Sequence, residues 1–237
     1  MQSDTLFPST HATWITVQLD AIDRGDAAHA DRAVRALRDH VMRRYYEPLS
    51  AYLSATGYRD VDAPSALVAG YFVERFADSA NIDRWRASGL PLRRWLMNGL
   101  LLWVRGEIRR RRTHSTRERP LADGLLADTP TAEAVFEREW ARGILSDACE
   151  IVERALHDAG DTQRWSLFAR HVLDGRTYDE IAREAGVRAS DARNATRMVR
   201  ERVDAALARL LIDEGVPPAD VPLELARIHS IIGEGRP

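Results

Sequence analysis

The residues best suited to binding a partner are arginines that recur near the end of the chain. At 100° per residue, Arg193, Arg197 and Arg200 would form one stripe along a helix, with Asn194 beside it and Arg188 just ahead. A guanidinium can hydrogen-bond to phosphate or to guanine O6 and N7 in the major groove, and an Asn amide can pair with adenine. These residue types indicate contact with duplex DNA. The competing interpretation is a solvated surface helix with internal ion pairs.

The segment ahead of this stripe has the signals of a helix-turn-helix. Thr177-Tyr178-Asp179-Glu180 matches a capping box that would start a short helix. Gly186 allows the left-handed backbone of a tight helix end, Val187 would pack into the core, and Ser190 could cap the second helix. A short helix, a glycine turn and a second helix of this size form the helix-turn-helix pattern. The core face of the second helix would consist of Ala192, Thr196, Val199 and Val203.

Charge is concentrated in two islands. The chain of 237 residues has 34 basic residues, all of them Arg, against 36 acidic ones, so its net charge is −2. Between Arg93 and Arg119, nine Arg stand against two Glu, a net charge of +7. Between Arg188 and Arg202, five Arg stand against two acids, a net charge of +3. Two basic islands in an otherwise acidic chain indicate two separate anion contacts, because the local field matters more than the total charge.

The sequence gives no support to an enzyme or to a membrane protein. It contains no Gly-rich phosphate loop, no G-x-S-x-G and no H-E-x-x-H, and its seven His have no metal-ligand spacing. Cys149 is the single cysteine, which excludes an intramolecular disulfide and a multi-Cys metal site. We therefore expect no catalytic residues, no metal and no cofactor. The most apolar stretch, Trp95 to Val104, is ten residues long, and residues 1–11 lack a secretory pattern, so we expect a cytoplasmic protein.

Nearly every segment has a helical pattern, and runs of alternating β-branched residues are lacking. Pro48 indicates a start or kink between helices over about 30–46 and 49–56. Residues 113–131 are rich in Pro, Gly, Ser, Thr and Asp and have little periodicity, which is typical of a flexible linker. The sequence predicts an all-α fold of two small helical domains, residues 1–112 and 132–237, joined by that linker. The second domain would hold the helix-turn-helix and a tail helix over Val221 to Ile232, which we expect to pack on it.

Five stretches, spread over nearly the whole chain, match motifs that occur together in one protein family. They are Tyr45-Tyr46-Glu47-Pro48-Leu49 followed by Gly57, Leu67-Val68 with Tyr71-Phe72, Trp95-Leu96 ahead of Arg109 to Arg112, Phe136-Glu137-Arg138-Glu139-Trp140, and Tyr178-Asp179-Glu180-Ile181-Ala182 with Gly186-Val187. On these motifs the chain resembles bacterial RNA polymerase sigma factors of the extracytoplasmic-function (ECF) type. The helix-turn-helix alone is moderately specific, whereas all five stretches in order are much more so.

The resemblance implies a protein that directs RNA polymerase to specific promoters for transcription initiation and makes no bonds itself. The first domain would bind the β′ clamp helices of core RNA polymerase through Leu67, Val68, Tyr71, Phe72 and Arg75. It would also hold the melted downstream promoter element, using stacking and a cationic groove, through Trp103, Arg105, Arg109, Arg110, Arg111 and Arg112. The second domain would bind the upstream promoter element through Arg188, Arg193, Asn194, Arg197 and Arg200. Trp95 and Trp103 are equally plausible as core residues.

Several positions depart from the family pattern. The family usually has Asp and Gln where this chain has Ala66 and Ala69, and Asn and Asp where it has Leu102 and Gly106. These departures keep open a sigma-like helix-turn-helix regulator that no longer engages core polymerase. A third class is a helical interaction protein without DNA binding. The sequence leaves an anti-sigma factor open as a further partner, and we expect a monomer when the protein is free.

Overall fold

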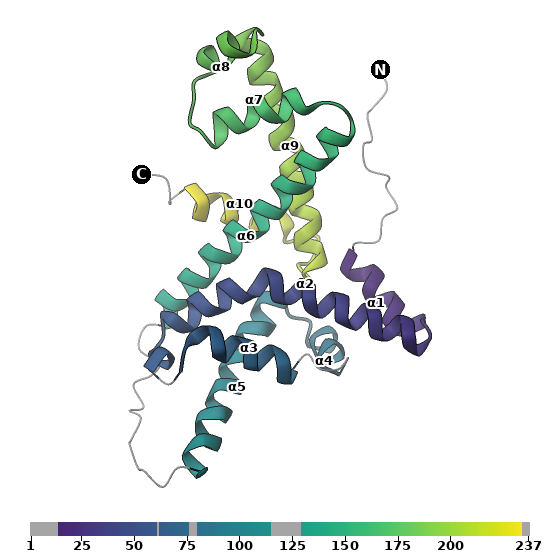
Figure 1. Ribbon diagram of the computed structural model, residues 1–237, viewed down its shortest axis with the longest axis vertical. Coiled ribbons are helices and arrows are strands. Elements are labelled where there is room, and N and C mark those ends of the chain that lie inside the picture. Colours follow the sequence, from purple (N-terminus) through teal and green to yellow (C-terminus); the bar gives the residue numbers. More distant parts are fainter. Residues whose placement is uncertain (1–13, 61, 76–79, 115–128, 234–237) are drawn as a thin grey trace.

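The computed structural model describes residues 14–60, 62–75, 80–114 and 129–233, and all regular structure in these ranges is helical (Figure 1). The all-α prediction is therefore confirmed for the part of the chain that the structure describes. In chain order the elements are α1 (Trp14–Arg24), α2 (Ala27–Ser54), the 3-10 turn η1 (Gly57–Asp60), α3 (Pro64–Arg75), α4 (Ala80–Ser88), α5 (Leu92–His114), α6 (Thr129–Asp158), α7 (Thr162–Val172), α8 (Tyr178–Ala185), α9 (Ala189–Asp213) and α10 (Val221–Gly233).

The long helix α2 forms the centre of the first half. Asp26 caps its start, since the Asp26 carboxylate accepts a hydrogen bond from the His29 backbone N–H at 2.9 Å. One face of the helix is buried at a spacing of four residues, which is close to one helical turn: Ala33, Leu37, Val41 and Tyr45. The predicted helix start at Pro48 is wrong, because α2 runs continuously through it. Pro48 is itself buried, so packing on this segment offsets the one backbone hydrogen bond that proline removes.

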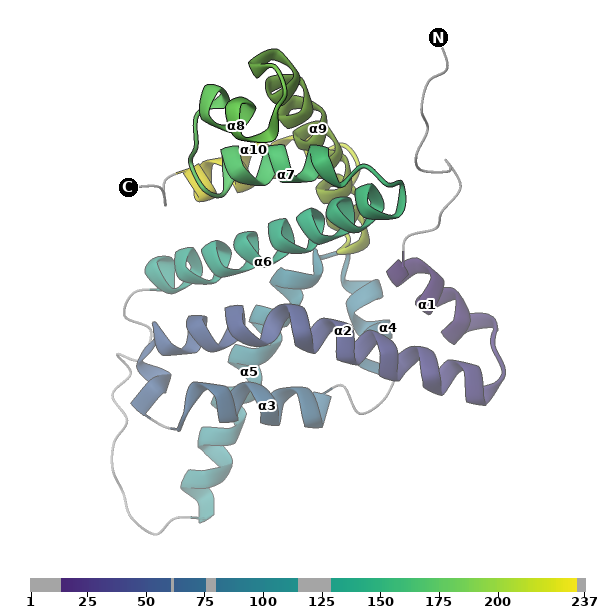
Figure 2. The ribbon, with the colours of Figure 1, turned by 45° about the horizontal axis from the view of Figure 1, so that its top comes forward.

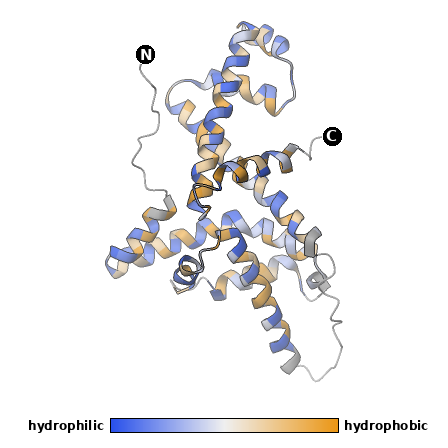
Figure 3. Ribbon diagram, turned by 180° about the vertical axis from the view of Figure 1, so that it is seen from behind, coloured by the Kyte–Doolittle hydropathy of each residue, from blue (hydrophilic) through white to orange (hydrophobic). Residues whose placement is uncertain are grey.

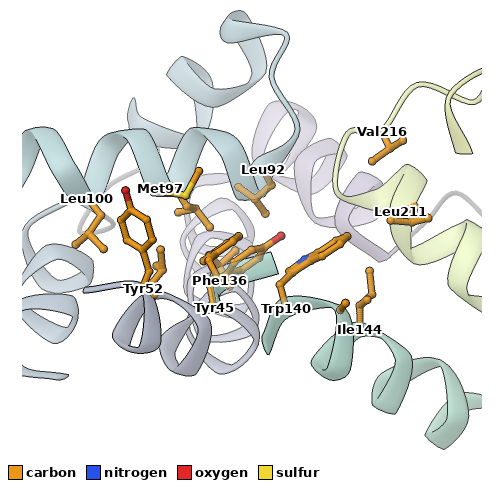
Figure 4. Packing of buried hydrophobic residues seen from close by; sticks show 14 of the residues in the cluster. Tyr45, Tyr52, Leu92, Met97, Leu100, Phe136, Trp140, Ile144, Leu211 and Val216 are labelled. Atoms are coloured by element: carbon orange, nitrogen blue, oxygen red, sulfur yellow. The ribbon is translucent and has the colours of Figure 1, made fainter. Parts of the chain in front are cut away.

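The two halves of the chain share one hydrophobic core. Figure 2 shows α6 lying antiparallel along α2, and these two helices make the most extensive helix pair in the structure. In the core, the side chains of α2 and α5 meet those of α6 and the end of α9 (Figure 4). The two predicted domains are thus not packed separately, although their boundaries stay a prediction. Residues 115–128 of the expected linker lie outside the described residues. Members of the shared core include Tyr45, Tyr52, Leu92, Met97, Leu100, Phe136, Trp140, Ile144, Leu211 and Val216.

A buried carboxylate just beyond α9 ties the halves together. Glu214 is fully buried, and its side chain accepts hydrogen bonds from Arg44 at 2.7 Å, from the Tyr45 hydroxyl at 2.6 Å and from Trp140 Nε1 at 3.1 Å. The Leu92 backbone N–H donates to the Glu214 carbonyl oxygen at 2.8 Å. Helices α2, α5 and α6 therefore all contact one residue, and its buried carboxylate accepts from three side-chain donors.

A second, smaller cluster lies at the far end of α9. Leu167 of α7, Ile181 of α8, and Ala192 and Ala195 of α9 form a core apart from the main one. At the other end of α9, α10 packs against α6 and α9 with Ile228 fully buried, as expected for the tail helix. The hydrophobic colouring of Figure 3 gathers in α10 and the adjoining part of α9. Helix α9 thus belongs to both clusters and connects them.

Candidate nucleic-acid interface

Helices α8 and α9 meet through the local signals that the sequence contains. The capping box at the start of α8 is confirmed: the Thr177 hydroxyl accepts from the Glu180 backbone N–H at 3.4 Å, and the Glu180 carboxylate accepts from the Thr177 N–H at 2.9 Å. Gly186 ends α8 with φ +65°, the left-handed conformation that glycine adopts without strain. The predicted cap at Ser190 is wrong. Helix α9 begins one residue before Ser190, with Arg188 in the capping position and no side-chain capping bond.

The structure separates the two faces of α9 as its periodicity predicts. The predicted core residues Ala192, Thr196, Val199 and Val203 are all buried. Every residue predicted to contact the upstream DNA element is exposed, namely Arg188, Arg193, Asn194, Arg197 and Arg200. Their side chains are therefore accessible to a partner, and DNA contact itself stays a prediction.

The arginines of this stripe differ in their neighbours. Arg188 forms a two-pronged ion pair with Asp191, with both N–O distances at 2.9 Å, and its hydrogen bonds hold the pKa of Asp191 below the ordinary value. Arg197 pairs with Glu201 at 2.8 Å. The Arg193 guanidinium instead lies 5.4 Å from the centre of the Tyr178 ring. Exposed ion pairs of this kind contribute little stability, so phosphate can replace the carboxylates at small cost.

The basic end of α5 is also exposed, but several of its charges are paired. Arg110 contacts Glu107 at 2.8 Å and Glu74 at 3.5 Å, and Arg111 contacts Glu107 at 2.9 Å and Asp62 at 3.0 Å. The exposed Arg105 donates to the Tyr58 hydroxyl at 3.1 Å.

Arg109 is exposed as well, and the side chain of Arg112 lies outside the described residues. Figure 1 places this end of α5 far from α8, at the opposite end of the long axis of the molecule. The structure therefore does not bring the two predicted DNA contacts together.

Trp103 does not form a stacking surface, and its assignment to single-stranded DNA is wrong. Its side chain is buried, and Nε1 donates to Glu74 at 2.9 Å, a bond that holds the pKa of Glu74 below its ordinary value. The ring lies over α3 at Gly70, where an added Cβ would come within 2.9 Å of it. The indole fits because Gly70 has no side chain, so Trp103 is a core residue and bases cannot stack on it.

Four of the five residues predicted to bind polymerase are also core residues. Only Arg75, at the end of α3, is exposed. The others are at most 2% exposed and fill the space between α3 and its neighbours, so their assignment as contact residues is wrong. They are Leu67, Val68, Tyr71 and Phe72.

The outward face of α3 is apolar. Ala66 is exposed, Ala69 is half-buried, and the Val73 side chain is 71% exposed. Two of the positions where the chain departs from the ECF pattern, Ala66 and Ala69, therefore lie at the surface, where a partner would meet them. None of these three side chains can donate or accept a hydrogen bond.

Some arginines of the first basic island form ion pairs within the protein, which the net charge of the segment does not reveal. The Arg93 side chain is 3% exposed, pairs with Glu224 at 2.8 Å and lies 4.4 Å over the Trp140 ring. Arg94 pairs with Glu133 at 3.5 Å. These partners come from α6 and α10, far away in the sequence. The island contacting solvent is therefore smaller than the sequence predicts.

Comparison with models of protein families, with curated proteins and with solved structures finds no match. Among the described residues, none of the helices has the length and apolar character needed to cross a membrane. A search of the same residues for clustered His, Cys, Asp and Glu side chains finds no group suited to holding a metal ion.

Proposed function

We propose that this protein is a divergent sigma factor of the ECF type, which directs RNA polymerase to specific promoters. The observation that carries the proposal is the exposed arginine stripe on α9, held by a capped helix and a left-handed glycine turn. This arrangement occurs in a chain with five ECF-like motifs in order. The role requires no chemistry from this chain, because the polymerase makes the bonds, and it implies a cytoplasmic location.

Upstream promoter DNA would be bound by the first half of α9. Helix-turn-helix proteins insert the second helix into the major groove with its N-terminal residues against the base edges. Arg193, Asn194 and Arg197 lie in the first turns of α9 with Arg188 just ahead of it, all four are exposed, and Arg200 lies about one turn further along. Arginine donors can read guanine or hold phosphate, and the Asn194 amide can read adenine.

The remaining contacts of the proposal use surface residues. Melted downstream DNA would be held by the arginines at the end of α5, chiefly as phosphate contacts, because Trp103 is buried. Core polymerase would meet the outward face of α3, and Arg75 at the end of that helix would add a charged contact beside it. The proposal leaves an anti-sigma factor open as a partner and keeps the free protein as a monomer.

A second candidate is a sigma-like DNA-binding regulator that does not engage core polymerase. Two observations favour it. The outward face of α3 has Ala66 and Ala69 where the family has polar residues, and the shared core holds the two halves in one unit. Both candidates use the same α9 stripe, and they differ only in polymerase binding.

Reconstitution of the full chain with core RNA polymerase separates these functions. A sigma factor should bind core polymerase at low salt and start transcription at mapped promoters. DNA binding without polymerase binding would support the regulator. Retention of DNA that is unchanged by combined Arg193→Ala and Arg197→Ala would contradict both and favour an interaction protein. The matched control is Arg209→Ala, an exposed arginine on the same helix outside the stripe. Each lost phosphate contact should reduce the log-salt slope by about 0.9.

A further inference from the structure

We propose that Tyr178 is a positioning residue that holds Arg193 ready for DNA recognition. The inference rests on the proposed DNA binding. Tyr178 is the first residue of α8 and is half-buried against the small cluster. Its ring stacks with His171 from the end of α7 at 3.9 Å between ring centres, and Arg193 of α9 lies 5.4 Å from its centre. This ring of α8 thus contacts the two other helices, α7 and α9, at the proposed DNA-binding end.

The Tyr178 ring is held in a defined plane by its partner. His171 Nδ1 lies 2.8 Å from the Arg176 carbonyl oxygen, so this nitrogen carries the proton and donates it. The Arg176 guanidinium in turn pairs with Glu184 of α8. These bonds join the end of α7 to α8 around the stacked pair. The ring therefore presents a fixed face to α9.

Arg193 differs from the other leading arginines in what it contacts. Arg188 and Arg197 direct their donors at carboxylates of their own helix, Asp191 and Glu201. Arg193 forms no carboxylate pair among the described residues. A ring attracts a guanidinium through its π face, which leaves the N–H donors at the guanidinium edge accessible. Arg193 can then hydrogen-bond to a base without first breaking an ion pair.

The contact restricts Arg193 before DNA arrives. A free arginine side chain loses rotamer entropy when it is immobilised in an interface, and restricting it in advance reduces that loss. Without the ring, Arg193 keeps its charge and its donors but has a wider range of positions. Loss of the ring should therefore weaken binding and reduce the base preference that depends on Arg193. It should have no effect once Arg193 is absent.

A double-mutant cycle tests this role. The probe is a duplex fragment that the wild-type full-length protein selects from a random library. Tyr178→Met keeps apolar bulk but removes the ring, and Tyr178→Phe keeps the ring as the matched control. We expect Tyr178→Met to weaken binding about three- to fivefold, because Arg193 then loses on binding the rotamer freedom that the ring had already restricted. In the Arg193→Ala background the same change should have less than about 1.5-fold effect. Tyr178→Phe should bind as the wild type does.

The possible failures are distinct. Equal losses in both backgrounds, or no loss from Tyr178→Met, would overturn the positioning role while leaving DNA binding intact. A wild-type protein that selects no duplex would overturn the proposed function and this inference together. Thermal melting of each variant shows whether α8 still folds. If Tyr178→Met lowers the melting temperature, Tyr178→Leu in the same cycle provides a second ring-free variant. The base preference at the position read by Arg193 is then compared between these variants and the wild type, at a temperature where all of them are folded.

Discussion

Replacing Glu214 by glutamine removes one charge from the centre of the shared core. The Glu214 side chain is 1% exposed, and that of its partner Arg44 is 5% exposed, so neither charge is accessible to water. Losing one member of a buried ion pair costs about 3–5 kcal/mol, because the other charge stays buried without its partner. Glutamine keeps one carbonyl oxygen, which can still accept a hydrogen bond from Tyr45 or Trp140. Arg44 also keeps its contact with Asp147.

We therefore expect Glu214→Gln to lower the free energy of unfolding by about 3 kcal/mol, the low end of that range. Urea denaturation followed by circular dichroism measures the change. The matched control is Glu201→Gln, which breaks the exposed pair with Arg197 and should cost less than about 1 kcal/mol. A loss for Glu214→Gln no larger than that of the control would refute the reasoning, since it would mean that the buried pair does not hold the two halves together.

Three further predictions concern local features. Gly186→Ala should destabilise the protein by about 1–2 kcal/mol in thermal melting, because an L-residue is strained at φ +65° although nothing else obstructs its Cβ. Trp103→Ala should cost about 3–5 kcal/mol in urea denaturation while leaving the salt dependence of DNA binding unchanged, as expected of a core residue. Burial raises the pKa of Asp213 to about 7 from 3.8, so folding favours its protonated form, and its contribution to stability is present below about pH 4 and lost as the pH rises to about 7. Asp213→Asn should gain stability over the wild type across that window in urea denaturation at several pH values. His40, whose pKa burial lowers to about 4, has the opposite trend but is present in both proteins. A constant difference between the two proteins would contradict the assignment to Asp213.

The features that the sequence predicted well depend on residues close together in the chain. The capping box of α8 joins positions three apart, and the turn at Gly186 depends on that residue's own backbone. The exposed stripe and the buried face of α9 follow from helical periodicity alone, once the helix is assigned. Such interactions need no knowledge of the tertiary structure.

The wrong predictions concern what covers an apolar face. Periodicity identifies Leu67 and Tyr71 as one face of a helix, but it cannot say whether that face packs inside the chain or against a partner. Trp103 is buried because Gly70, 33 positions earlier, leaves space for it. The shared core is of the same kind, since α2 and α6 pack together although a long stretch of chain separates them. Contacts of this length leave no local pattern.

Helix α9 is one uninterrupted helix from Ala189 to Asp213, so a change of orientation at one end moves the other. Its C-terminal half packs in the main core as far as Leu211, and its N-terminal half carries the exposed Arg193 next to Ala192 of the small cluster. At 1.5 Å per residue, these two positions are about 27 Å apart along the axis. A tilt of only a few degrees at Leu211 would therefore displace the arginine stripe by more than an ångström. The angle at which the stripe meets a groove therefore depends on how the C-terminal half of the helix packs in the main core, away from the stripe.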